Sequence, residues 1–198
     1  MNISTENITV IILAGGKSSR MKTDKGLIDI SGRTLVQHVI DNTASITANQ
    51  MIISNRYEYQ KFGLPVFSDI IADKGPAAGV ATGLQNSTTD LNLISTCDSP
   101  YINNDLYFEM LDHLEDHDVI VPRYNKRLYP LTAVYRRSCY KTIMTCINAN
   151  DLSMKSILSF LNTKILNIEK GSALDNPRNF LNINTVSDLK ELQHDGQH

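Results

Sequence analysis

The sequence of 198 residues lacks tryptophan, contains only three cysteines, and has no apolar run approaching the roughly 20 residues of a membrane-spanning helix. Cys97, Cys139 and Cys146 form neither a CxxC pair nor a zinc-ligand spacing. An odd, sparse set of cysteines argues against a disulfide framework and for a reducing compartment. The first nine residues lack the features of a secretory signal. We therefore expect a cytoplasmic protein that binds no membrane.

The sequence also lacks an excess of charge of either sign. Its 19 basic and 21 acidic residues give a formal net charge of -2, which offers no electrostatic argument for a nucleic-acid partner. Hydrophobic residues make up 41% of the chain, enough to bury a core without disulfides or structural metals. With no repeat and no linker-like shift in composition, residues 1–198 are expected to form a single domain.

Short apolar runs alternate with segments whose apolar residues recur at helical spacing. Runs without polar alternation suit strands covered on both faces, and they predict strands at residues 9–13, 51–54, 91–95, 119–121, 132–135, 165–168 and 180–183. Helical stripes lie within residues 35–40, 106–114, 143–147 and 157–161, and a capping box predicts a last helix from Thr185. The alternation predicts a layered α/β domain with a mostly parallel sheet. Ligands of such sheets bind beyond the carboxyl ends of the strands.

The loop after the first predicted strand carries the strongest functional signal. It runs Leu13-Ala-Gly-Gly-Lys-Ser-Ser-Arg-Met-Lys-Thr-Asp-Lys25. Gly15 and Gly16 permit unusual turns and close approach to a ligand, and successive N–H groups in such a turn form an anion-binding concavity. Arg20 and Lys25 add positive charge suited to the β- and γ-phosphates of a nucleotide. The loop therefore predicts a phosphate site.

Two familiar phosphate motifs do not fit this loop. A P-loop requires glycine five positions before Gly16, where the chain has Ile11. The dinucleotide fingerprint GxGxxG is absent because Gly15 and Gly16 are adjacent and no glycine follows in register.

An acidic motif follows the third predicted strand. Asp98, in Thr96-Cys-Asp-Ser-Pro100, stands where the strand ends and where a proline restricts the backbone. A carboxylate at this position is suited to hold Mg²⁺ against the phosphates neutralised by Arg20 and Lys25. Cys97 has no histidine nearby in sequence to activate it, so we expect a small buried residue and not a nucleophile.

Together these motifs resemble the signature of nucleotidyltransferases with a three-layer α/β/α Rossmann-like fold, and within them the molybdenum cofactor guanylyltransferases of the MobA type. The resemblance extends along nearly the whole chain. The matching segments are Leu13-Ala-Gly-Gly-x-Ser-x-Arg-Met with Asp24-Lys25; Ser54-Asn-Arg56; Asp69 with Asp73; Gly75-Pro-Ala-Ala-Gly79; Cys97-Asp-Ser-Pro100; Tyr129-Pro-Leu131; and Phe180-Leu-Asn-Ile-Asn-Thr185.

The resemblance implies a Mg²⁺-dependent transfer of GMP from GTP to the terminal phosphate of molybdopterin or its molybdenum form, with release of pyrophosphate. Arg20, Lys25 and Asp98 would be catalytic, Asp98 would hold the metal, and Asn182 and Asn184 would lie on the pterin side. The GTP-binding positions it implies are Leu13, Ala14, Gly15, Gly16, Lys25, Asn55, Asp69, Gly75, Pro76 and Asp98. Residues 8–100 would bind the nucleotide, and residues 101–193 would complete the acceptor site. Molybdenum-inserting proteins or molybdoenzyme chaperones are further partners that it suggests.

The sequence departs from the family pattern at two positions. Lys22 stands where a glycine usually follows the Arg-Met pair, and Thr96 stands where the family tends to have proline. Neither change removes an expected phosphate or metal contact.

The residue that recognises the base remains open, and so do three other functions. Guanine presents two adjacent donors that one carboxylate could accept, and Asp69 or Asp73 could supply it, although either could equally cap a helix or contact the ribose. Cytidylyltransferases of the family tend toward Ala-Ala-Gly where this chain has Ala14-Gly15-Gly16. A sugar-phosphate nucleotidyltransferase and a non-catalytic nucleotide-binding regulator are the remaining alternatives.

Overall fold

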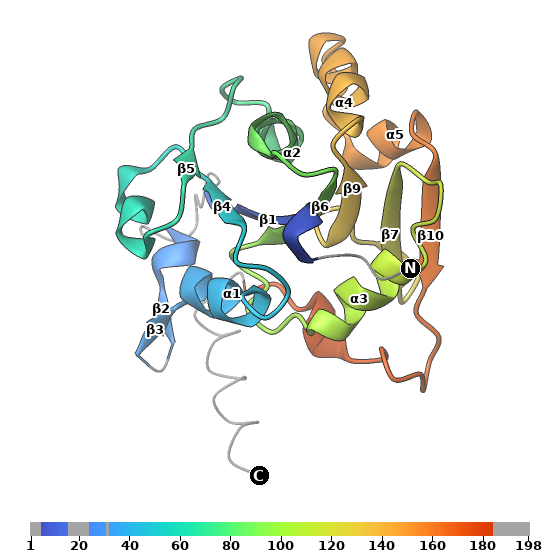
Figure 1. Ribbon diagram of the computed structural model, residues 1–198, viewed down its shortest axis with the longest axis horizontal. Helices are drawn as coiled ribbons and strands as arrows, with labels where there is room; N and C mark the ends of the chain where they lie inside the picture. The colour runs from blue at the N-terminus through green and yellow to red at the C-terminus, as the bar shows by residue number, and fades with distance from the viewer. Residues whose placement is uncertain (1–4, 16–23, 31, 184–198) are drawn as a thin grey trace.

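A central sheet runs through the computed structural model, which describes residues 5–15, 24–30 and 32–183 (Figure 1). Its order is β10-β7-β9-β6-β1-β4-β5, with β8 paired to β7. The bounds are β1 Ile8–Leu13, β4 Gln50–Ile53, β5 Val66–Phe67, β6 Leu91–Thr96, β7 Val119–Tyr124, β8 Arg127–Leu128, β9 Ala133–Arg136 and β10 Thr163–Asn167. A separate antiparallel ribbon joins β2 (Asp29–Ile30) to β3 (Arg33–Thr34).

Helices cover both faces of the sheet, as Figure 1 shows. On one face, α1 (Leu35–Thr43) and α3 (Asn104–Asp112) pack their apolar stripes into one core cluster. On the other face, α2 (Gly75–Asn86), α4 (Cys139–Asn148) and α5 (Met154–Ser159) pack into a second cluster. Short 3₁₀ helices complete the described elements: η1 Thr5–Asn7, η2 Lys25–Leu27, η3 Tyr57–Phe62 and η4 Pro177–Phe180. The predicted three-layer α/β/α architecture is confirmed.

The direction of the strands fixes where a ligand site can form. β1 pairs in parallel with β4 and β6, with Ile12 opposite both Ile52 and Ser95. β9 is antiparallel to both β6 and β7, so β7 runs in the same direction as β1. The residues that follow Leu13, Ile53 and Thr96 therefore leave the sheet at one common edge. None of the helices in the described part of the chain has the length and apolarity needed to cross a bilayer.

The elements predicted from the sequence differ from the structure in two places: one predicted strand does not form, and one helix was not predicted. Residues 180–183 form no strand: Phe180 ends the 3₁₀ helix η4, which Pro177 opens and which the Asn176 side chain caps by accepting from the Arg178 amide at 3.0 Å. Helix α2 was not predicted, because its composition is dominated by small residues and glycine, which has low helix propensity. The predicted last helix from Thr185 lies outside the described residues.

Glycine in α2 allows this helix to lie close to β1. A Cβ on Gly83 would meet Ile11 Cγ2 at 2.4 Å, and one on Gly79 would meet Leu13 Cδ2 at 3.2 Å. Because real Cβ atoms do not approach other atoms so closely, a larger residue at Gly83 would push the helix away from the strand. The glycines thus bring the amino end of α2 near the loop that follows Leu13.

Candidate functional site

Three strand ends meet at the carboxyl edge of the sheet. The Ala14 amide donates to Ile53 O at 2.9 Å, and the Cys97 amide donates to Leu13 O at 3.0 Å. These bonds bring the loops after β1, β4 and β6 into contact. Gly15 has φ +127°, a backbone conformation that side-chain-bearing residues rarely adopt, so this position favours glycine.

Asp98 and Lys25 face each other at this edge. Lys25 Nζ lies 3.9 Å from Asp98 Oδ2, and the two side chains are 26% and 19% exposed. The Thr96 hydroxyl donates to the other oxygen, Oδ1, at 2.6 Å. The position that departs from the family pattern therefore adds a hydrogen bond that orients the predicted metal ligand.

A later part of the chain also reaches Asp98. The Ile183 amide donates to Asp98 O at 2.9 Å, and the Ser99 hydroxyl donates to Asn182 Oδ1 at 3.0 Å. Ser99 Oγ also lies 3.0 Å from Thr96 Oγ1. The structure thus brings Asn182, predicted for the acceptor side, next to the turn that carries Asp98.

Asn55 and Asp69 form a reciprocal pair. The Asn55 side-chain amide donates to Asp69 Oδ2 at 2.9 Å, and the Asp69 backbone amide donates to Asn55 Oδ1 at 2.9 Å. Partial burial raises the pKa of the Asp69 carboxyl above its usual value, while the bond from Asn55 opposes that change. The pair fixes the direction of a carboxylate that could accept donors from a ligand.

Helix α2 lies beside this pair at Gly79. A Cβ on Gly79 would stand 3.8 Å from Asp69 Oδ1. Gly75 and Pro76 open the helix, and its N-cap is Lys74, whose side chain makes no capping bond. Asp73 has φ +59° in the turn that precedes this N-cap position.

Sequence reasoning gave no separate role to Asp24, which the structure shows to be buried. Its Oδ1 accepts from the Gly26 amide at 3.0 Å and from the Tyr59 hydroxyl at 2.5 Å. Arg56 Nε lies 2.9 Å from Oδ2, an ion pair and not an aligned hydrogen bond, since Oδ2 has no hydrogen-bond partner among the described residues. An Asp that caps a turn is common in loops, so its burial could not be read from the sequence.

Cys97 is buried, as predicted, and burial raises the pKa of its thiol to about 12. A thiol of such a pKa is almost entirely protonated near neutral pH, so it is unsuited to act as a nucleophile. The predicted residues Gly16, Arg20, Lys22 and Asn184 lie outside the described residues.

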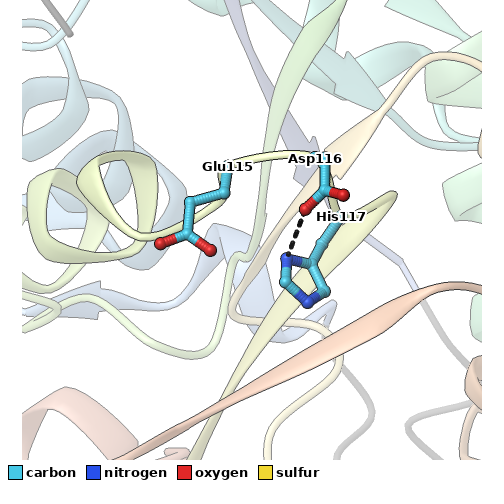
Figure 2. Close-up of side chains that lie close together, drawn as sticks. All are labelled: Glu115, Asp116 and His117. Atoms are coloured by element: carbon cyan, nitrogen blue, oxygen red, sulfur yellow. Dashed lines mark ion pairs between the residues drawn. The ribbon is translucent and has the colours of Figure 1, made fainter.

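A second group of metal-capable side chains lies at the opposite edge of the sheet. Glu115, Asp116 and His117 precede β7, and Figure 2 shows their side chains gathered at one turn. The group already has partners: Glu115 pairs with Lys164 at 3.0 Å, and Asp116 with His117 at 3.6 Å. We read it as a set of surface ion pairs, separate from the predicted magnesium site.

Comparisons with known proteins show which family the chain resembles. A family model described as the MobA-like NTP transferase domain matches residues 10–165. The "Probable molybdenum cofactor guanylyltransferase" of Flavobacterium johnsoniae is 33% identical over 188 residues, covering 94% of this chain and 97% of that protein.

Two solved structures share the fold. The first, molybdopterin-guanine dinucleotide biosynthesis protein A from Archaeoglobus fulgidus, has a TM-score of 0.80 at 20% identity over 94% of this chain and 97% of that one. The second, 4-diphosphocytidyl-2C-methyl-D-erythritol synthase from Anaerococcus prevotii, has a TM-score of 0.72 at 13% identity over 96% of each chain. At these identities the likeness shows the fold alone.

Proposed function

The chain belongs to the family of MobA-like NTP transferase domains, and from this membership we propose that it transfers GMP from GTP to the phosphate of molybdopterin, releasing pyrophosphate. The name of the Flavobacterium johnsoniae relative, which matches over nearly the whole of both chains, supports this choice of nucleotide and acceptor. The single observation that carries the proposal is the pairing of Asp98 with Lys25 at the sheet edge where Gly15 has φ +127°.

The chemistry requires positioning and charge neutralisation more than proton transfer. The acceptor phosphate is already an anion near neutral pH, so its attack on the α-phosphorus needs no general base. Negative charge builds on the leaving pyrophosphate, and Lys25 is suited to neutralise it. Leu13, Ala14 and Gly15 would line the nucleotide, and Arg20 would join Lys25 on the phosphates.

Asp98 is suited to hold a magnesium ion. Mg²⁺ is usually bound by one or two carboxylates together with substrate phosphates and water, and Asp98 offers a partly exposed carboxylate beside the proposed phosphate site. When bound, the ion would orient the α-phosphate and neutralise its charge. In the free protein, the Lys25 ammonium compensates the same carboxylate.

Asp69 is our candidate for guanine recognition. Its Oδ2 accepts the Asn55 amide, which fixes the plane of the carboxylate. A fixed carboxylate can accept from the N1–H and N2–H₂ of guanine, whereas cytosine has only one such donor group on that edge. Gly75 and Pro76 would complete the base side at the start of α2.

The acceptor side would include Asn182 and Asn184. An Asn side chain both donates and accepts, which suits a pterin rich in hydrogen-bonding groups. In this arrangement residues 8–100 bind the nucleotide and residues 101–193 complete the acceptor site. A molybdenum-inserting protein or molybdoenzyme chaperone would be the partner that exchanges acceptor or product.

The test is pyrophosphate release from GTP or CTP, each with and without molybdopterin, in the presence of Mg²⁺. We expect release with GTP that depends on both molybdopterin and magnesium. Release with CTP instead would favour a cytidylyltransferase. If the protein binds a nucleotide but releases no pyrophosphate with either molybdopterin or a sugar phosphate as acceptor, it would be a binding regulator. Release with a sugar phosphate alone would identify a sugar-phosphate enzyme.

A further inference from the structure

A buried carboxylate stands next in the chain to the cation of the proposed site. The Asp24 side chain is only 3% exposed, and Asp24 is the N-cap of η2, the turn that begins at Lys25. Burying a charge is costly unless that charge is paired and hydrogen-bonded. Asp24 meets this condition through contacts with a segment more than thirty residues further along the chain.

The two long-range partners of Asp24 are Arg56 and Tyr59, which both follow β4. The fully buried Tyr59 donates its hydroxyl to Asp24 Oδ1 at 2.5 Å, and Arg56 Nε forms the ion pair with Oδ2 at 2.9 Å. Burial, the nearby Cys97 and the bond to Asp24 raise the pKa of Tyr59 far above its usual value, so the hydroxyl keeps its proton and remains a donor. The turn at Lys25 is therefore tied to η3.

Gly26 shows how tightly the turn is held. A Cβ at this position would lie 2.3 Å from the Tyr59 hydroxyl oxygen and 3.1 Å from Cys97 Sγ. The backbone next to Lys25 is thus pressed between η3 and the residue that precedes Asp98. From this fixed backbone the Lys25 ammonium lies 3.9 Å from Asp98 Oδ2.

We propose that Asp24, anchored by Tyr59 and Arg56, is a positioning residue that holds Lys25 where it can bind the triphosphate. The inference rests on the proposed function, in which Lys25 contacts phosphate. A lysine ammonium moves on a flexible four-carbon stem, and ordering that stem costs conformational entropy. Fixing the backbone beneath it lowers the cost of binding, as preorganisation does in general.

The first variant is Tyr59→Phe, which keeps the ring and deletes the hydroxyl that holds Asp24. We expect the dissociation constant for GTP to rise about tenfold, as for a weakened charge-assisted contact, while that for guanosine stays unchanged. Both constants are measured by calorimetry well below the melting temperature. If this variant does not fold, Asp24→Asn takes its place: it keeps the shape but turns an amide donor or a neutral oxygen toward Arg56.

Tyr107→Phe is the matched control. Tyr107 is also fully buried in the same core cluster, and its hydroxyl donates to Ile94 O at 2.8 Å. Its loss should lower the melting temperature without changing the dissociation constant for GTP. A purely structural role for Tyr59 would give the same pattern.

A double-mutant cycle identifies Lys25 as the route of the effect. Lys25→Ala should weaken GTP binding more than Tyr59→Phe does and should spare guanosine. Adding Tyr59→Phe to Lys25→Ala should then cause little further loss, because the residue that is positioned has gone.

The possible outcomes separate this inference from the function on which it rests. Wild-type affinity for GTP in Tyr59→Phe, or losses that add fully in the cycle, would overturn the positioning role while leaving GTP binding intact. If the wild-type protein binds no nucleoside triphosphate, the proposed function fails and the positioning role fails with it.

Discussion

At the scale of single residues, the two carboxylate oxygens of Asp98 differ in their contacts with the chain. Thr96 donates to Oδ1 at 2.6 Å, and the Lys25 ammonium lies 3.9 Å from Oδ2. A hydrogen bond directed at one oxygen fixes the plane of the carboxylate, while the more distant ammonium supplies charge without close contact. Such an arrangement leaves Oδ2 open to a metal ion or to a phosphate complex of one.

Asp98→Asn should abolish transfer while preserving the fold, because it removes the charge but keeps the shape. Loss of a strong electrostatic contact in a transition state costs on the order of 10²-fold in rate or more. The measurement is pyrophosphate release at saturating GTP across a magnesium titration, with the melting temperature as the check on folding. Near-normal turnover at saturating magnesium would remove Asp98 from the metal-binding role.

Thr96→Val tests the orientation of the same carboxylate. Valine replaces the hydroxyl with a methyl group of similar size, so Asp98 loses the donor to Oδ1 but keeps its charge. A hydrogen bond to a charged group contributes about 1.5–3 kcal/mol, and we expect kcat/KM to fall by about tenfold or more. Thr96→Ser is the control, since it retains the hydroxyl. Equal loss in both variants would mean that the methyl group matters and the hydrogen bond does not.

The sequence indicated the site residues that follow strands. It could not indicate site residues whose environment depends on distant parts of the chain. Gly15 and Asp98 come shortly after apolar runs, so their common edge follows from the geometry of parallel sheets. The burial of Asp24 depends on Tyr59, 35 residues away, and no local pattern encodes that contact. The functional roles of these residues stay predictions.

At the scale of elements, sequence interpretation missed one helix and predicted one strand that does not form. Helix α2 was missed because its many small residues produce no strong apolar stripe, although the eight residues from Ala77 to Leu84 are all buried. The apolar residues at 180–183 resemble a strand, but Pro177 opens a 3₁₀ turn and Phe180 stacks on Tyr124 with ring centroids 4.6 Å apart. In both places tertiary packing overrides local propensity.

Gly83→Ala tests the close packing of α2 on β1. In an exposed helix this change would stabilise by roughly 1 kcal/mol, but here the new Cβ would meet Ile11 Cγ2 at 2.4 Å. We expect a net destabilisation of about 1–3 kcal/mol, typical of overpacking, measured by urea denaturation.

The same contact supplies a second-site control for that prediction. Ile11→Ala alone should destabilise by creating a cavity. The double variant with Gly83→Ala should lose less than the sum of the two changes, because the clashing atoms are gone. A more stable Gly83→Ala protein would show that α2 can move away from β1 at little cost.

At the scale of the whole molecule, the last described segment of the chain returns to the turn after β6 that carries Asp98. The sequence predicted a mostly parallel sheet, but it could not place β9 in reverse between β6 and β7, because strand order is not encoded in local periodicity. In this order β7 and β10 lie on the β9 side of β6. The segment that follows β10 returns to the end of β6, where residues 182 and 183 contact the Asp98 turn.

Asn182→Ala should therefore impair use of molybdopterin while sparing affinity for GTP. Asn182 contacts Ser99 at 3.0 Å and adjoins the residue bonded to Asp98 O, so an acceptor bound there would lie close to the metal ligand. We expect the KM for molybdopterin to rise about tenfold, the order of effect that the loss of one hydrogen bond can have. Steady-state kinetics with each substrate varied in turn separate the two effects.

Asn179→Ala is the matched control for this prediction, because Asn179 lies in the same segment and makes a buried hydrogen bond to a different part of the chain. Its buried Oδ1 accepts from the Asn103 amide at 2.8 Å, so its loss should lower the melting temperature without changing the KM for molybdopterin. If Asn182→Ala behaves in the same way, with lower stability and unchanged kinetics per folded molecule, then Asn182 only holds the segment in place. The acceptor would in that case bind elsewhere along the carboxyl edge of the sheet.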